Sequence, residues 1–122
     1  MTIHLDTSAL VGALAGPREA SDRLHGFIAE RHRVQLSAIV LYEWLRGPRT
    51  VNELRVQEEL FPGAQAVPFG TEAAAQAAAL YAQLPRARGR DIAIAACALV
   101  HDAALWTLNP RDFSDVPGLK LM

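Results

Sequence analysis

Four of the 13 acidic residues differ from the others in their surroundings, because they lie among apolar neighbours or directly after a short apolar run. These residues are Asp6, Glu43, Asp91 and Asp112. Carboxylates that gather in a cleft repel one another, and each raises the pKa of its neighbours unless a cation balances the charge. Mg²⁺ binds oxygen ligands, keeps several waters and uses few protein carboxylates. The four acids therefore favour a site for a hard divalent cation, Mg²⁺ or Mn²⁺.

Each of these acids also has an ordinary structural interpretation. Asp6 and Asp91 are suited to cap a helix, since Asp is a preferred N-cap residue. Glu43 can form an ion pair with Arg46, three residues further along a helix. Asp112 lies in a sequence typical of turns. The argument for a site therefore rests on the four acids together rather than on any one of them.

Other metal and redox chemistry has little support in the sequence. The four histidines show no short spacing of the kind that zinc ligands have, and Cys97 is the single cysteine. We therefore expect neither a zinc site nor an internal disulfide.

The order of apolar runs and helical patterns indicates an α/β fold. Strands are predicted over residues 2–5, 34–36, 66–69 and 104–107, with a last edge strand over 118–122. Helices are predicted over residues 9–14, 18–31, 38–46, 50–60, 72–84 and 92–101, and a polar loop over 86–90. Strands that alternate with helices imply a mostly parallel sheet covered on both faces. We expect a three-layer α/β/α domain with four to five short strands, spanning residues 1–122 as a single domain.

This architecture predicts where the acids meet. In an open parallel sheet, ligands bind in the crevice beyond the carboxyl ends of the strands. Asp6 ends the first strand, Glu43 lies about two turns into the helix after the second, Asp91 opens a helix and Asp112 follows the fourth strand. All four are expected to face one crevice.

Composition narrows the class of protein. Hydrophobic residues make up 51% and charged residues 20% of the chain, as in ordinary globular domains. The longest apolar run, residues 92–100, is about half of the roughly 20 residues that a membrane-spanning helix needs. The N-terminus has no pattern of a secretory signal. We therefore expect a cytoplasmic protein with no membrane segment.

The charge balance limits how the chain can bind a polyanion. The formal net charge is -1, so bulk positive charge cannot hold nucleic acid. Of the 12 basic residues 11 are arginine, however, and several lie close together in the sequence. Because arginine offers a planar fork of donors that fits phosphate, local patches remain able to bind a polyanion.

Four segments, in order along the chain, resemble the PIN-domain ribonucleases, and among them the VapC-type toxins of prokaryotic toxin–antitoxin modules. The segments are LDTSAL at residues 5–10, the pattern Ser37-x-x-Val40-x-x-Glu43-Trp44, DIAIAA with the following AL at residues 91–99, and LWTLN through DF to VPGL at residues 105–119. Each segment is weakly specific alone, and the four together span nearly the whole chain.

The resemblance implies a set of roles for the acids. Asp6, Glu43 and Asp91 correspond to the first three acids of the family. Asp6 and Asp91 would bind the metal directly, and Glu43 and Asp112 would act through water or a second ion. Many relatives carry an aspartate where this chain has Asn109. Either Asp112 supplies the fourth carboxylate, or the site works with three.

The resemblance also implies an activity and partners. The activity is metal-dependent endonucleolytic cleavage of RNA by a metal-activated water. The implied partners are the RNA substrate, a VapB-like antitoxin and a second copy of the chain in a homodimer. Candidate substrate-binding residues are Ser8, Arg46, Arg49, Arg90, Asn109 and Arg111.

Two other functions remain open on the sequence. One is a PIN nuclease that is not a toxin and acts in RNA processing or on structured DNA. The other is a non-catalytic α/β module that binds nucleotide or protein. Neither of the glycine-rich phosphate loops G-x-G-x-x-G and G-x-x-x-x-G-K-[ST] occurs in the chain, which weakens the binding-module interpretation.

Overall fold

Three parallel strands form the sheet at the centre of the molecule. The computed structural model describes residues 1–84 and 88–122. Strands β1 (Thr2–Leu5), β2 (Arg33–Leu36) and β3 (Ala104–Trp106) pair in the order β2-β1-β3. β1 is therefore the central strand, and its residue Ile3 aligns with Val34 on one side and with Ala104 on the other.

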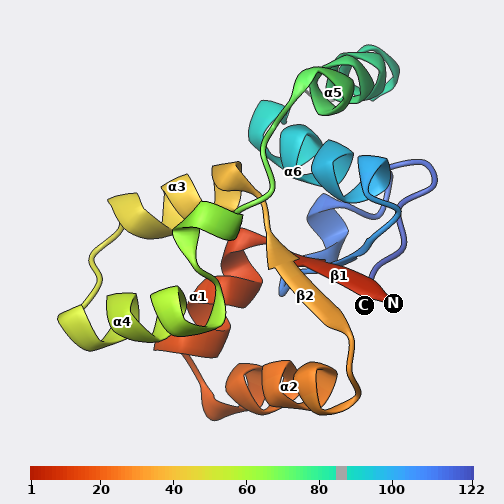
Figure 1. Ribbon diagram of the computed structural model, residues 1–122. Coiled ribbons are helices and arrows are strands. Elements are labelled where there is room, and N and C mark those ends of the chain that lie inside the picture. Colours follow the sequence, from red (N-terminus) through yellow and green to blue (C-terminus); the bar gives the residue numbers. More distant parts are fainter. Residues whose placement is uncertain (85–87) are drawn as a thin grey trace.

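Helices cover both faces of this sheet (Figure 1). Helices α1 (Thr7–Ala15) and α2 (Arg18–Ala29) connect β1 to β2. The longer connection from β2 to β3 contains α3 (Ala38–Arg46), α4 (Val51–Leu60), the 3₁₀ turn η1 (Gly63–Gln65), α5 (Thr71–Gln83) and α6 (Gly89–Val100). A second 3₁₀ turn, η2 (Pro110–Asp112), follows β3. In Figure 1, α1 and α2 lie on one side of the sheet and the paired helices α5 and α6 on the other. The expected α/β fold is confirmed.

The sheet is smaller than the four to five strands that we expected. Within residues 1–84 and 88–122 it has three strands, and each of the two missing strands is reduced to one bridge. Val67 pairs with Ser37, and Leu121 pairs with Leu105. The pairing at Val67 ends there because the partner segment enters α3 at Ala38, directly after Ser37, and because Val67 follows the turn η1 closely.

Helix starts also differ from those expected. α1 begins at Thr7 rather than at residue 9, so Ser8 belongs to its first turn. α6 begins at Gly89 rather than at residue 92, which brings Arg90 and Asp91 into its first turn. Residues 86 and 87 of the expected loop lie outside the described residues. These shifts put more of the candidate site on helices.

Helix α3 illustrates how the sequence positions a functional residue. Ser37 follows β2 directly, and its hydroxyl accepts a hydrogen bond from the Val40 amide at 3.2 Å, which fixes the start of the helix. Val40, Glu43 and Trp44 then recur at helical spacing and are all buried. Glu43 therefore lies on the inward face of α3 because its apolar neighbours bury that face.

No helix among the described residues is long and apolar enough to cross a membrane.

Candidate active site

The four acids that we expected at one crevice line a single cleft of about 240 Å³. Asp6 directly follows β1, Asp112 ends η2 after β3, Glu43 projects from α3, and Asp91 lies in the first turn of α6. The cleft is thus at the carboxyl ends of the strands, as the parallel topology requires.

Asp6 is held by two hydroxyl groups. Thr107 Oγ1 donates a hydrogen bond to Asp6 Oδ2 at 2.8 Å, and Ser8 Oγ donates to the same oxygen at 2.9 Å. The two hydroxyls in turn accept the amides of Asn109 and Leu108, each at 3.0 Å. Because Asp6 is only 6% exposed, these bonds fix the direction of its carboxylate.

Glu43 is engaged through both of its carboxylate oxygens. Thr7 Oγ1 donates to Oε1 at 2.5 Å. Oε2 forms an ion pair with Arg90 at 2.8 Å across the cleft and a longer one with Arg46 at 3.5 Å on its own helix. The expected pairing with Arg46 is therefore present, and Arg90 makes the closer contact.

The carboxyl group of Asp91 has a raised pKa. Burial raises the pKa of its carboxyl group, and the nearby charges of Asp6 and Asp112 raise that pKa further. The positive charges of Arg90 and Arg88 lower it in part. Burial and two neighbouring carboxylates therefore both oppose ionisation of Asp91, and a bound cation would offset them.

The backbone of Asp112 is held by an arginine at the start of α6. Arg88, just before α6, donates to the backbone carbonyl of Asp112 and forms an ion pair with Asp115 at 2.6 Å. These contacts join the η2 segment to the start of α6, which carries Asp91. Asn109 also lines the cleft, so the alternatives of Asp112 and Asn109 lie side by side there.

The candidate substrate-binding residues divide into two groups. Ser8, Arg46, Arg90 and Asn109 line the cleft, whereas Arg49 and Arg111 are not among its lining residues. Arg49 instead packs its guanidinium 4.2 Å from the centre of the Trp44 ring and donates Nε to the Trp44 carbonyl at 2.9 Å. That contact gives Arg49 a structural task in α3.

The sequence analysis missed two threonines that contact acids of the cleft. Thr7 and Thr107 bind Glu43 and Asp6 directly. The available signal was position: Thr107 follows β3 just as Asp6 follows β1, so both lie at the carboxyl end of a strand.

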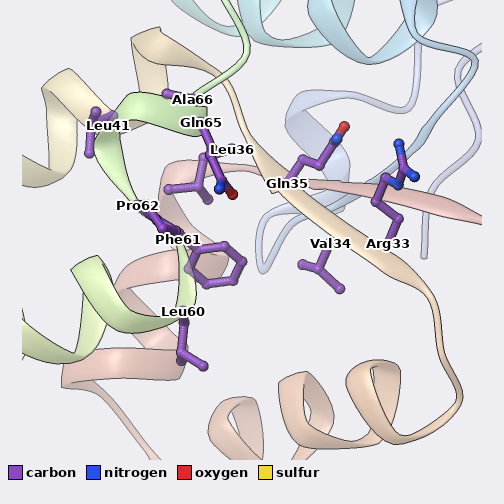
Figure 2. Close-up of a pocket in the computed structure, with 10 residues that line it drawn as sticks. All are labelled: Arg33, Val34, Gln35, Leu36, Leu41, Leu60, Phe61, Pro62, Gln65 and Ala66. Carbon is purple, nitrogen blue, oxygen red and sulfur yellow. The ribbon is translucent and has the colours of Figure 1, made fainter.

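A larger cavity of about 480 Å³ lies beside β2, away from the acids (Figure 2). Leu60, Phe61 and Pro62 line one side, and Val34 and Arg33 of β2 line the other. It has no carboxylate in its lining. The chemistry therefore belongs to the smaller acidic cleft.

A model of the PIN domain family matches residues 3–119, which is nearly the whole chain. The chain belongs to the PIN-domain family. None of the curated proteins compared with this PIN domain matches it.

Solved structures similar to this PIN domain come from toxin–antitoxin systems. A chain from VapBC2 of Rickettsia felis, bound to a DNA fragment from its promoter, has a TM-score of 0.80 and 21% identity, with 100% of this chain and 98% of that chain covered. A chain from DNA-bound VapBC of Salmonella typhimurium has a TM-score of 0.78 and 23% identity, with 100% of this chain and 97% of that chain covered. A chain from a toxin–antitoxin complex of Klebsiella pneumoniae has a TM-score of 0.77 and 26% identity, with 96% of this chain and 94% of that chain covered. The first two likenesses show the shared fold.

The donor chemistry of this PIN domain fits a hard divalent cation. Asp6 and Asp91 offer carboxylate oxygens on one cleft, and burial together with the charge of Asp6 raises the pKa of Asp91. Among residues 1–84 and 88–122, no three acidic, histidine or cysteine side chains stand close enough to form a ready-made ligand group. Mg²⁺ commonly uses one or two carboxylates and fills its other positions with water, so the two aspartates suffice.

Proposed function

We propose that this PIN domain is a divalent-metal-dependent endoribonuclease and the toxin of a toxin–antitoxin pair. The observation that carries the proposal is the cleft itself, where Asp6, Glu43, Asp91 and Asp112 meet from four separate segments. The raised pKa of Asp91 supports it, because a carboxylate that is partly buried beside other carboxylates is stabilised in its charged form by a bound cation.

In this proposal, Asp6 and Asp91 hold Mg²⁺ or Mn²⁺, and Glu43 and Asp112 act through water. A bound divalent cation supplies Lewis acidity, which polarises a phosphodiester and lowers the pKa of water. Thr107 and Ser8 keep Asp6 oriented through their hydrogen bonds.

Positive charge at the rim of the cleft supports binding of a nucleic-acid backbone. Arg46 and Arg90 line the cleft, and their side chains are 53% and 60% exposed. Arginine forks fit phosphate oxygens. If these residues bind RNA mainly through its backbone, affinity falls steeply as salt concentration rises.

The test of the activity is cleavage of total cellular RNA by the purified, antitoxin-free protein. We expect cutting with Mg²⁺ or Mn²⁺, none with EDTA, and products with 5′-phosphate and 3′-hydroxyl ends. Asp6→Asn and Asp91→Asn, each verified as folded, should abolish cutting. Asp102→Asn is the matched control, because Asp102 is exposed and lies before β3, at the opposite end of that strand from the cleft. Cutting that survives EDTA and both substitutions would refute the proposal.

The toxin role is tested in cells. The similarity to chains from VapBC complexes, over nearly their whole length, supports a VapB-like antitoxin as partner. We expect induction of the wild-type chain to arrest growth, the Asp6→Asn variant to permit it, and the product of a neighbouring gene to copurify and restore growth. Growth arrest is absent if the chain is an RNA-processing nuclease or a binding module. We further propose a homodimer, which light scattering of the purified chain measures.

A further inference from the structure

Arg90 and Glu43 form an ion pair that spans the candidate active site. Arg90 Nη1 lies 2.8 Å from Glu43 Oε2, although the two residues belong to α6 and α3. The side chain of Glu43 is only 4% exposed, whereas that of Arg90 is 60% exposed. A buried carboxylate is thus paired with a cation whose remaining surface faces water.

This pair occupies the oxygen that Glu43 would otherwise present to the cleft. Thr7 already donates to Oε1, so with Arg90 on Oε2 both oxygens have partners. Arg90 also lies 3.9 Å from Asp91 Oδ1, so its charge is shared between two acids of the site. A buried carboxylate needs such compensation.

We infer that Arg90 is a displaceable counter-ion of Glu43. Arg90 neutralises the Glu43 carboxylate in the cleft until a divalent cation binds there and replaces it. The inference rests on the proposed metal site. Arg90 is suited to leave, because an exposed arginine on a long side chain returns to water at small cost. Glu43 is suited to stay, since α3 buries it between Val40 and Trp44.

The inference predicts that Arg90 and the metal compete. The experiment measures Mn²⁺ affinity by electron paramagnetic resonance of free Mn²⁺ in the wild-type protein, in Arg90→Gln, and in Arg46→Gln as matched control. Arg46 also lines the cleft and contacts the same oxygen, but at 3.5 Å. We expect Arg90→Gln to bind Mn²⁺ roughly fivefold more tightly, the scale of one partly exposed ion pair, and Arg46→Gln to show a smaller gain.

A second pair of variants separates competition at Glu43 from a general effect of charge. In a Glu43→Gln background, Arg90→Gln should increase Mn²⁺ affinity by less than it does in the wild-type protein, because only the longer-range effect of Arg90 on Asp91, at 3.9 Å, remains. An equal gain in that background would overturn the inference, as would no gain in Arg90→Gln or an equal gain in Arg46→Gln. If the folded wild-type protein binds no Mn²⁺ and cuts no RNA, the proposed function fails; if it binds Mn²⁺ and Arg90→Gln makes no difference, only the inference fails.

Discussion

The hydroxyl group of Thr107 helps to fix the direction of the Asp6 carboxylate, and we expect its removal to cause a measurable loss of stability. Thr107 is buried, and it donates to the Asp6 carboxylate at 2.8 Å. A hydrogen bond to a charged group contributes about 1.5–3 kcal/mol. We expect Thr107→Val, which keeps the shape and loses the hydroxyl, to lower the free energy of unfolding by about that amount.

The matched control is Thr107→Ser, which keeps the hydroxyl and loses one methyl group. Its cost is about 1 kcal/mol, the value for one buried methyl or methylene group. The assay is urea denaturation at pH 7, followed by circular dichroism. RNA cleavage by the same proteins should fall about tenfold or more in Thr107→Val, because Asp6 keeps Ser8 as its one side-chain donor among the described residues, and should stay near wild type in Thr107→Ser.

Asp6→Asn completes a double-mutant cycle with Thr107→Val. If the hydroxyl acts through the charge of Asp6, the cost of Thr107→Val should shrink in the Asp6→Asn background. A valine variant as stable as wild type, or a serine variant that loses more than the valine variant, would refute the reasoning.

Three other expectations concern stability. Burial lowers the pKa of His4 to about 4, against a smaller opposing effect of its hydrogen bond to Gln35. The unfolded chain binds this proton near pH 6.5, whereas the folded chain binds it only near pH 4. The contribution of His4 to the free energy of unfolding should therefore be complete above pH 6.5 and fall by up to about 3 kcal/mol as the pH drops to 4. Urea titrations across that range should show the fall in wild type and not in His4→Phe, and parallel curves would contradict it. Ser37→Ala should cost about 1 kcal/mol by removing the cap on the Val40 amide, with Ser37→Thr retaining most of the stability; equal losses in the two variants would speak against the cap. Gly118→Ala should cost about 1–2 kcal/mol in thermal or urea unfolding, because Gly118 has a φ of +78°, and an unchanged midpoint would argue against strain there.

The sequence was most informative about the acids and the type of fold. Asp6 and Asp91 could be found because each interrupts an apolar segment at a strand or helix boundary, and a parallel sheet brings such boundaries to one edge. The helices were predicted with the right order because glycine, proline and capping residues mark their ends. The roles of the acids remain predictions.

Other features depend on contacts that sequence patterns do not contain. The strand expected over residues 66–69 is reduced to one bridge. The sequence could not show this, because a short apolar run looks the same whether or not a neighbouring strand pairs with it. Arg90 and Glu43 are 47 residues apart, a separation taken from their positions, and no local pattern links them. Thr107 was predicted as the last residue of a strand, which indicates the edge of the sheet where it lies, but the sequence does not show that its hydroxyl bonds to Asp6.

The order in which β1, β2 and β3 occur along the chain has a consequence for synthesis on the ribosome. β1 is made first but is the central strand, and its partner β3 begins at Ala104. Until that segment leaves the ribosome, Asp6 lacks the Thr107 hydroxyl that orients it, and Asp112, which follows β3, cannot reach the cleft. If the chain is the nuclease that we propose, it therefore cannot cut RNA while it is being made, and its activity appears only when the β3 segment has been released and has folded.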